Sequence, residues 1–193
     1  AGDRNGDGYS DLSVAVINRT AKETTFLTTQ SPNFPARSSR TRFVINTAFD
    51  ALVPADYDGD CKLDYAGVKV LSDSTLEWST ELSGTVTKEI FGVNGSEPHA
   101  GNIEDIVSDP DQRADKVIVR PCLAPNEEEL CWSAKLSTGT EVTDLRFGMV
   151  GDNAFLGDSD GDGVVEFFVV RLSENLLTFY SRPLSSTTVT TVQ

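Results

Sequence analysis

The sequence of 193 residues contains one histidine, His99, and this scarcity excludes most histidine-based acid–base catalysis and most zinc sites. Its three cysteines include no Cys-x-x-Cys pair, the arrangement typical of zinc ribbons and dithiol redox centres. The serine-nucleophile motif Gly-x-Ser-x-Gly is absent as well. No run approaches the roughly eighteen consecutive apolar residues of a membrane helix, so we expect no membrane insertion.

Positive charge is also scarce, with 16 basic residues against 30 acidic ones and a net charge of −14. Because nucleic-acid affinity depends on Lys and Arg contacts to phosphates, we expect no nucleic-acid partner. The acids are not spread evenly along the chain. Eleven of the 30 lie in three segments of nine residues, 3–11, 56–64 and 158–166. The acidity therefore points to local sites.

The cysteines give one candidate disulfide. Cys122 and Cys131 bracket a turn-like insert between two strand-like runs, so their side chains are candidates to meet across a hairpin. Such a bond would fit an oxidising compartment. Cys61 would then be left unpaired, and its role stays open.

Internal repetition is the strongest organisational signal. The last acid of each acidic segment falls at Asp11, Asp64, Asp115 and Glu166, with spacings of 53, 51 and 51 residues. A period near fifty is typical of propeller blades. An apolar, β-branched run follows each of these acids, as expected for a strand. The predicted repeats cover approximately residues 1–42, 43–90, 91–146 and 147–193.

A second strand in each repeat is marked by a large aromatic residue, and a third carries alternating Thr and Val. We expect a short segment beginning at Phe91-Gly92 or Phe147-Gly148 to lead back from the third strand to the next acidic loop. The aromatics are Phe26, Trp78, Trp132 and Phe179. No segment has the sustained apolar spacing of a helix. We therefore predict an all-β fold, a β-propeller-like array of about four four-stranded repeats with calcium-binding β-hairpin loops. Trp78 and Trp132 are predicted to pack between blades rather than to stack on a sugar.

The three acidic segments share one pattern, with oxygen-bearing side chains at positions 1, 3, 5 and 9 and glycine at position 4 or 6. Ca²⁺ prefers about six to eight oxygen ligands, and a tight, glycine-bent loop turns alternate side chains inward together with the carbonyl of position 7. An EF-hand would need a Glu at position 12, where this sequence has Val14, Gly67 and Val169. The predicted ligands are Asp3, Asn5, Asp7, Tyr9 and Asp11, then Asp56, Asp58, Asp60, Lys62 and Asp64, then Asp158, Asp160, Asp162, Val164 and Glu166.

One more copy of the pattern, the third in chain order, is degenerate. It spans residues 102–115, which makes it longer than the others, and it places Arg113 where a ligand is expected. Arg113 is a candidate to replace the ion by pairing with the carboxylates. The residues of this degenerate site are Asn102, Glu104, Asp109, Asp111 and Asp115. We predict about three Ca²⁺ ions and leave the fourth open; three ions would bring the net charge to about −8.

These loops, with the Phe91-Gly92 and Phe147-Gly148 pairs and the Val53-Pro54-Ala55 lead-in, resemble the FG-GAP/VCBS repeats of integrin α-subunit propellers and bacterial surface proteins. The resemblance implies a propeller with one Ca²⁺ per blade hairpin, located outside the cell and serving adhesion or ligand binding. The sequence departs from the pattern at Cys61, where glycine is usual. Such propellers generally have about seven blades, so residues 1–193 are interpreted as one small domain, as part of a larger propeller, or as a subunit completed by another chain.

Three functions follow as hypotheses. The first is a non-enzymatic, calcium-stabilised module, secreted or at the cell surface, that binds a protein or a glycan. The second is a repeat subunit of a surface fibre or stalk, assembled with other copies of itself by strand complementation. The third is an enzyme acting on polysaccharides or esters, for which the sequence offers no evident catalytic residues.

Overall fold

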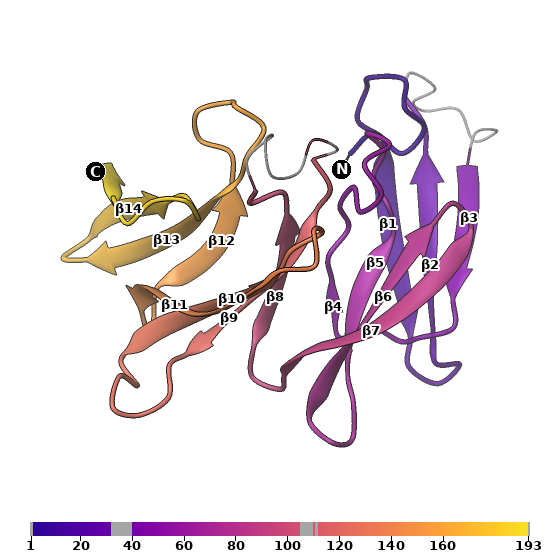
Figure 1. Ribbon diagram of the computed structural model, residues 1–193. Helices are drawn as coiled ribbons and strands as arrows, with labels where there is room; N and C mark the ends of the chain where they lie inside the picture. Colours follow the sequence, from indigo (N-terminus) through magenta and orange to yellow (C-terminus); the bar gives the residue numbers. More distant parts are fainter. Residues whose placement is uncertain (1, 32–39, 105–109, 111, 193) are drawn as a thin grey trace. The chain divides into compact units, whose positions relative to one another are not determined.

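The structure is a computed structural model that describes residues 2–31, 40–104, 110 and 112–192 (Figure 1). All the regular elements in these ranges are β-strands, and no described segment forms a helix that is long and apolar enough to cross a bilayer. The chain divides into two compact units, Ala1–Asn94 (unit 1) and Gly95–Gln193 (unit 2). The predicted all-β fold is confirmed.

Unit 1 contains two antiparallel sheets. Sheet I has the order β1-β2-β3 and sheet II the order β4-β5-β6-β7. The strands of sheet I are β1 (Leu12–Asn18), β2 (Glu23–Thr29) and β3 (Arg40–Ile45). Those of sheet II are β4 (Ala51–Leu52), β5 (Ala66–Val70), β6 (Thr75–Leu82) and β7 (Thr85–Val93).

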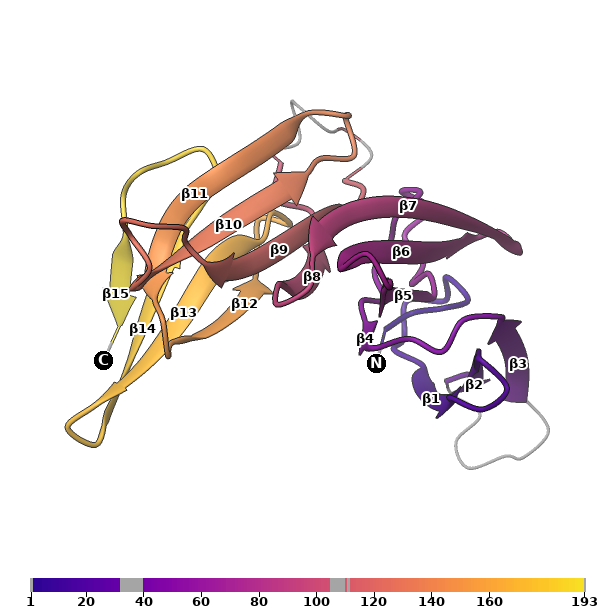
Figure 2. The same ribbon diagram turned by 90° about the horizontal axis from the view of Figure 1, so that it is seen from below.

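Unit 2 also contains two antiparallel sheets, whose strands can be followed in Figure 2. Sheet III has the order β11-β10-β9-β8 and sheet IV the order β12-β13-β14-β15. The strands of sheet III are β8 (Glu97–Gly101), β9 (Asp115–Pro121), β10 (Glu129–Lys135) and β11 (Glu141–Met149). Those of sheet IV are β12 (Asn153–Gly157), β13 (Glu166–Ser173), β14 (Leu176–Arg182) and β15 (Thr190–Val192).

Two details differ from the sequence prediction. In the described part of the chain, sheet I has three strands instead of four. Sheet II has β4 and an isolated bridge between Ala55 and Asp64, whereas sheet I has only the equivalent bridge, between Gly2 and Asp11. The Phe91-Gly92 and Phe147-Gly148 pairs, expected to begin the return to the next loop, lie inside β7 and β11. The reason is a hydrogen bond that holds each phenylalanine in its sheet.

Those hydrogen bonds come from the two buried tryptophans. Trp78 Nε1 donates to the carbonyl of Phe91 at 2.8 Å, and Trp132 Nε1 donates to the carbonyl of Phe147 at 2.7 Å. Each bond satisfies the one polar atom of a side chain that is otherwise apolar. The prediction that both tryptophans belong to the packed interior is confirmed, since each is 1% exposed.

The four sheets share one register. In each sheet, the predicted aromatic of the second strand lies directly opposite the residue four places after the last acid of the acidic loop. The pairs are Phe26 with Ala15, Trp78 with Val68, Trp132 with Val119, and Phe179 with Val170. Opposite partners point to the same side of a sheet, so they define an aromatic face in each one. The residue directly after the last acid points to the other side, here called the reverse face.

Within each unit, the aromatic face of the first sheet packs on the reverse face of the second. In unit 1, Phe26 of sheet I stacks on Tyr65 of sheet II, with ring centroids 4.3 Å apart. In unit 2, Trp132 of sheet III meets Phe167 of sheet IV edge to face at 5.1 Å. Phe167 and Trp132 lie in one buried apolar cluster with Val117, Val119 and other side chains of both sheets. The same packing is thus used twice in the chain.

The candidate disulfide between Cys122 and Cys131 is present. The two Sγ atoms are 2.08 Å apart and the two Cα atoms 4.9 Å apart, and the bond joins β10 to the segment that follows β9. Cys61 is a free, exposed cysteine. The pairing anticipated from the hairpin spacing is therefore confirmed.

Candidate functional site

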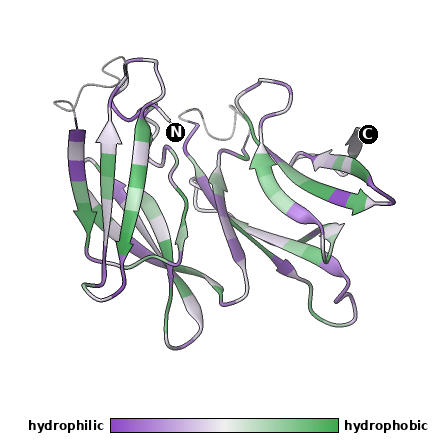
Figure 3. Cartoon of the chain, turned by 180° about the vertical axis from the view of Figure 1, so that it is seen from behind, coloured by the Kyte–Doolittle hydropathy of each residue, from purple (hydrophilic) through white to green (hydrophobic). Residues whose placement is uncertain are grey.

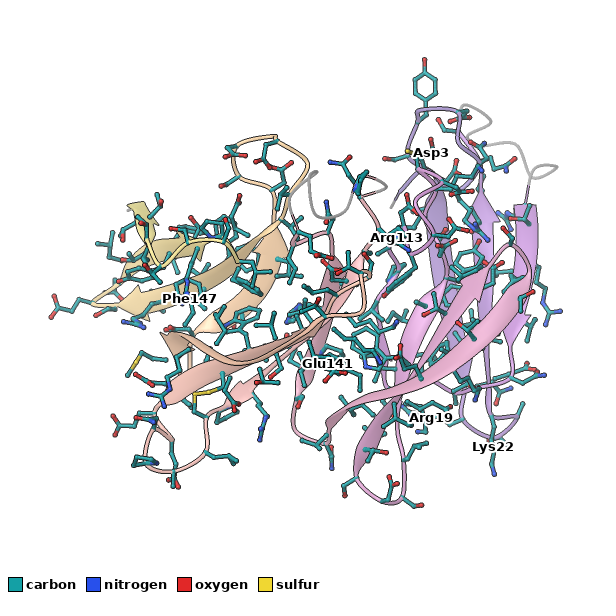
Figure 4. All side chains as sticks on the ribbon, in the orientation of Figure 1. Asp3, Arg19, Lys22, Arg113, Glu141 and Phe147 are labelled. Carbon is teal, nitrogen blue, oxygen red and sulfur yellow. A yellow bond between two sulfur atoms is a disulfide. The ribbon has the colours of Figure 1, made fainter. Side chains whose placement is uncertain are left out.

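Each acidic loop ends where a strand begins. The first loop (residues 3–11) precedes β1, the second (56–64) joins β4 to β5, and the fourth (158–166) joins β12 to β13. The prediction that strands rather than helices follow the loops is confirmed, which separates these loops from EF-hands. Asp3, which opens the first loop, is labelled in Figure 4.

The acid at position 1 accepts backbone N–H groups from positions 4 and 6. In the first loop, Asp3 Oδ1 accepts from Gly6 at 2.7 Å and Asp3 Oδ2 accepts from Gly8 at 2.7 Å. The same two bonds form from Gly59 and Cys61 to Asp56, and from Gly161 and Gly163 to Asp158. These amide donors lower the pKa of Asp158. The position-1 carboxylate therefore sets the curvature of the loop.

The side chains at positions 3 and 5 each accept one backbone N–H, from the residue two places later. Asn5 Oδ1 accepts the N–H of Asp7 at 2.9 Å, and Asp7 Oδ1 accepts the N–H of Tyr9 at 2.9 Å. The equivalent bonds of the other loops run from Asp60 to Asp58, from Lys62 to Asp60, from Asp162 to Asp160, and from Val164 to Asp162. Each side chain uses Oδ1 in these bonds. The proposed carbonyl ligands at Tyr9, Lys62 and Val164 remain predictions.

The acid at position 9 is buried in all three loops, at Asp11, Asp64 and Glu166. It accepts the backbone N–H of position 2, which closes the loop. The donors are Arg4 at 3.0 Å, Tyr57 at 2.9 Å and Ser159 at 3.0 Å. The Ser159 hydroxyl also donates to Glu166, at 2.8 Å. Charged carboxylates that are buried favour a positive charge nearby.

Carboxylates converge at two of the loops. In the part of the chain that the structure describes, ligand atoms of Asp56, Asp58 and Asp64 lie within 4.8 Å of one another, as do those of Asp158, Asp160 and Asp162. Asp60 and Glu166 fall outside these two groups. Asp60 instead forms an ion pair with Lys62 Nζ at 2.6 Å.

The first loop forms no such group among the described residues. Asn5 stands at position 3, where the second and fourth loops both have Asp, so one acid is missing from the set. Its Nδ2 donates to Asp7 Oδ2 at 3.1 Å. The first loop therefore has the same backbone hydrogen bonds as the other two loops, but its predicted ligands Asp3, Asp7 and Asp11 do not form a group of three close carboxylates.

The third loop (residues 102–115) keeps both ends of the pattern. Ile103 N donates to Asp115 Oδ2 at 2.8 Å, as position 2 donates to position 9 elsewhere, and Glu104 N donates to Asn102 Oδ1 at 3.2 Å. The Thr138 hydroxyl lies 3.0 Å from both carboxylate oxygens of Glu104. Asp109 and Asp111 lie outside the described residues. Replacement of the ion by Arg113, which is partly buried, therefore stays a prediction.

Neighbouring loops within each unit are joined by the same backbone hydrogen bond. Leu63 N, at position 8 of the second loop, donates to the carbonyl of Asp3 at 2.7 Å. Val165 N, at position 8 of the fourth loop, donates to the carbonyl of Asn102 at 2.7 Å. The third loop thus keeps its structural partner although its ligand set is altered.

Arg4 is a residue that the sequence analysis missed. Its guanidinium donates to the buried carboxylate of Glu81, lies 3.8 Å from Asp64 Oδ1 and covers the ring of Tyr65 at 4.6 Å from the centroid. It thus belongs to the first loop in sequence but contributes positive charge beside the second. No local signal marks it, because its partners are about 60 to 77 residues away.

Unit 2 contains a cleft beside the fourth loop, with a volume of about 500 Å³. Both carboxylates and apolar side chains line it. The lining includes Asp160, Asp162, Glu104, Leu136, Leu184 and Ser185. Such a mixture of a few polar groups with apolar walls is typical of ligand sites.

No family model, curated protein or solved structure matches this chain. The resemblance to FG-GAP/VCBS repeats therefore remains a prediction based on the loop motifs.

The backbone at Cys61 gives a first prediction. Cys61 has φ 62°, a left-handed conformation, whereas the equivalent Gly8 and Gly163 have φ 83° and 88°. We expect Cys61→Gly to raise the free energy of unfolding by roughly 0.5–1 kcal/mol, because removal of the Cβ strain outweighs the added freedom of the unfolded chain. Urea denaturation measures it. Cys61→Ala is the matched control, since it keeps the strain; equal stability of the two variants would contradict the prediction.

Asp64 gives a pH prediction. Burial raises its pKa to about 6; the N–H of Tyr57 and the charge of Arg4 oppose the shift, and Asp58 and Asp56 reinforce it. Because the folded state then binds this proton more tightly than the unfolded chain, stability should rise as pH falls from about 7.5 to about 5. Thermal unfolding in EDTA measures this gain, which we expect to be smaller in Asp64→Asn. An equal gain in both proteins would count against the assignment.

Proposed function

We propose that this chain is a non-enzymatic, calcium-binding module that acts outside the cell and recognises a protein or a glycan. The observation that carries the proposal is the shared hydrogen bonding of three nine-residue loops, in which the side chains at positions 1, 3, 5 and 9 accept the same backbone N–H groups. Turns that only face solvent would not require three loops to hold their acids in the same geometry, whereas metal-binding loops would.

The donor set fits a hard divalent cation. The side-chain donors are mainly carboxylates, and Ca²⁺ prefers oxygen ligands. In the second and fourth loops, three carboxylates already lie within 4.8 Å of one another. A bound Ca²⁺ would neutralise part of their mutual repulsion, and this is the chemistry that the ion supplies.

We expect the three loops to differ in affinity. The fourth loop brings Asp158, Asp160 and Asp162 together, and no side-chain cation among the described residues pairs with them, so it should bind Ca²⁺ most tightly. In the second loop, the Lys62 ammonium competes for Asp60. In the first loop, Asn5 supplies a neutral oxygen in place of a charged one. Affinity of such loops depends strongly on ligand charge.

The role that we assign to the ions is structural. In the second and fourth loops, the position-9 acid is followed directly by a residue packed between sheets, Tyr65 in unit 1 and Phe167 in unit 2. Backbone hydrogen bonds then join neighbouring loops at Leu63 and Val165. An ion in a loop would therefore stiffen both the loop and the sheet that it begins.

Extracellular location is part of the proposal because of the disulfide. Cys122 and Cys131 are bonded in the structure, and such bonds persist in oxidising environments.

Binding rather than catalysis is favoured by the surroundings of the single histidine. His99 lies against Trp132, with ring centroids 6.0 Å apart, and burial lowers its pKa.

Calcium titration calorimetry tests the metal sites. We expect about three ions per chain, and Asp162→Asn should remove or weaken one site at least tenfold, on the order of 1.4 kcal/mol, because it removes a charge while keeping an oxygen for the Val164 N–H. The matched control is Asp144→Asn, which removes one charge from an exposed residue outside the loops. Saturating calcium should also raise the unfolding temperature, and EDTA should reverse the rise.

Absence of calcium uptake at millimolar concentration, or an unfolding temperature that EDTA leaves unchanged, would overturn the calcium proposal. Loss of a site in Asp144→Asn would show that net charge rather than the loop decides binding.

We place the ligand contact in the cleft beside the fourth loop. A glycan array and a candidate-protein screen in the presence of calcium would identify the ligand, and Ser185→Arg should weaken its binding at least tenfold by filling the cleft with a cation attracted to Asp160 and Asp162. Thr187→Arg, at an exposed position outside the lining, is the control. Equal weakening by both variants would contradict this placement. Turnover of a ligand in a hydrolase assay would contradict a non-enzymatic role.

A further inference from the structure

The reverse face of sheet I is apolar and exposed. Leu12, Val14 and Val16 alternate along β1, and Leu27 of β2 lies directly opposite Val14, so the four side chains share one face. All four are exposed. Apolar colour runs along much of β1 in Figure 3.

The aromatic face of sheet IV is apolar and exposed as well. Phe155 lies opposite Phe168 and stacks on it with ring centroids 5.1 Å apart, and Leu172 lies opposite Leu177 in the same sheet. Phe179, opposite Val170, shares this face. Phe155, Leu172, Leu177 and Phe179 are all exposed.

These two faces carry positions that are buried elsewhere in the chain. Phe179 is 40% exposed, whereas its equivalent Trp132 is 1% exposed. Leu12 is 51% exposed, whereas the equivalent Tyr65 and Phe167, each directly after the last acid of a loop, are 3% and 1% exposed. The exposed positions therefore belong to the sheet-on-sheet packing that each unit already uses once.

The two exposed faces are also of opposite kind. The established interfaces join an aromatic face to a reverse face, as Phe26 meets Tyr65 and Trp132 meets Phe167. Sheet IV leaves an aromatic face without a partner sheet of its own unit, and sheet I leaves a reverse face. Repeat arrays in solution normally end in sheets with a polar outer side, and large exposed apolar patches mark interaction sites. These two faces instead combine exposed apolar side chains with polar ones, which include Thr25 and Arg42 in sheet I and Ser181 in sheet IV.

We propose that the aromatic face of sheet IV packs on the reverse face of sheet I of a second copy of this chain, head to tail. By continuity with the two interfaces inside the chain, Phe179 of one copy would meet Leu12 of the next. On the reverse face of sheet I, Arg42 lies opposite Leu27 and Glu23 opposite Asn18, so this face carries charge of both signs. A contact between different surfaces is heterologous and generates rings or filaments.

This packing involves sheet faces and differs from exchange of an edge strand. None of the predicted loop ligands takes part in this contact.

Thiol cross-linking tests the contact. In a Cys61→Ser background, one chain carries Leu12→Cys and another carries Phe179→Cys, and the two are mixed with a short thiol-specific cross-linker. We expect covalent dimers in the mixture and far fewer with either variant alone, because the contact joins two different surfaces. A chain carrying both substitutions should form ladders of two or more copies.

Sedimentation velocity from about 2 to 200 µM gives the second measurement. The unsubstituted protein should associate as concentration rises, and Val14→Lys should abolish association by placing a charge on the reverse face of sheet I. Leu123→Lys is the control, since Leu123 is 69% exposed and lies in the loop between β9 and β10, outside either face. Association should persist in this variant.

A protein that stays monomeric throughout this range, together with no cross-link in the mixture, would overturn the proposal. Cross-linking that closes only within single chains of the double variant would also overturn it, because the occupant of each face would then be the same molecule. Equal loss of association in Val14→Lys and Leu123→Lys would show that the faces are not responsible.

Discussion

The structure depends on a junction at which the last acid of a loop is followed at once by a residue packed between sheets. Asp64 is buried and closes the second loop, and Tyr65 beside it stacks on Phe26 of the neighbouring sheet. Glu166 and Phe167 repeat this junction in unit 2. Because a charged group and a core side chain are neighbours in the chain, the electrostatics of each loop and the packing of its sheet are coupled.

Backbone amides, rather than side-chain cations, hold most of the loop acids in place. The position-1 aspartate gathers the N–H groups of positions 4 and 6, and this requires a left-handed backbone at position 4, where all three loops have glycine. The carboxylates are then brought close without neutralising charge. Such an arrangement is stable only to the extent that something offsets their repulsion. Arg4 and Lys62 supply positive charge at the second loop, and the divalent ion that we propose would supply it more generally.

The third loop keeps backbone hydrogen bonds of the acidic loops but not their full set of acids. It keeps the bonds from Ile103 to Asp115 and from Val165 to Asn102, which correspond to bonds in the acidic loops. It has Asn102 where the others have Asp, and the Thr138 hydroxyl contacts the Glu104 carboxylate. The ends of the loop therefore serve the sheet even where the ligand set differs.

Much of this protein follows from its sequence alone. Alternation along the strands, the spacing near fifty residues and the glycines of the loops are local signals, so the all-β fold, the positions of the loops and the Cys122–Cys131 pair could be predicted. Local signals also placed Trp78 and Trp132 in the interior, because their neighbours are strand residues of alternating polarity. The number of strands in sheet I and the position of the Phe-Gly pairs were not predicted correctly.

Only the tertiary structure decided which distant groups meet. The contact of Arg4 with Glu81 and Asp64, the pairing of Lys62 with Asp60 in place of convergence, and the exposure of Phe179 and Leu12 at positions that are buried in other repeats depend on which sheets are neighbours. The repeat pattern assigns equivalent roles to equivalent residues. Their burial differs because a residue on the face that packs against the other sheet of its unit is covered, as Trp132 is, whereas the equivalent residue on an uncovered face, such as Phe179, is exposed.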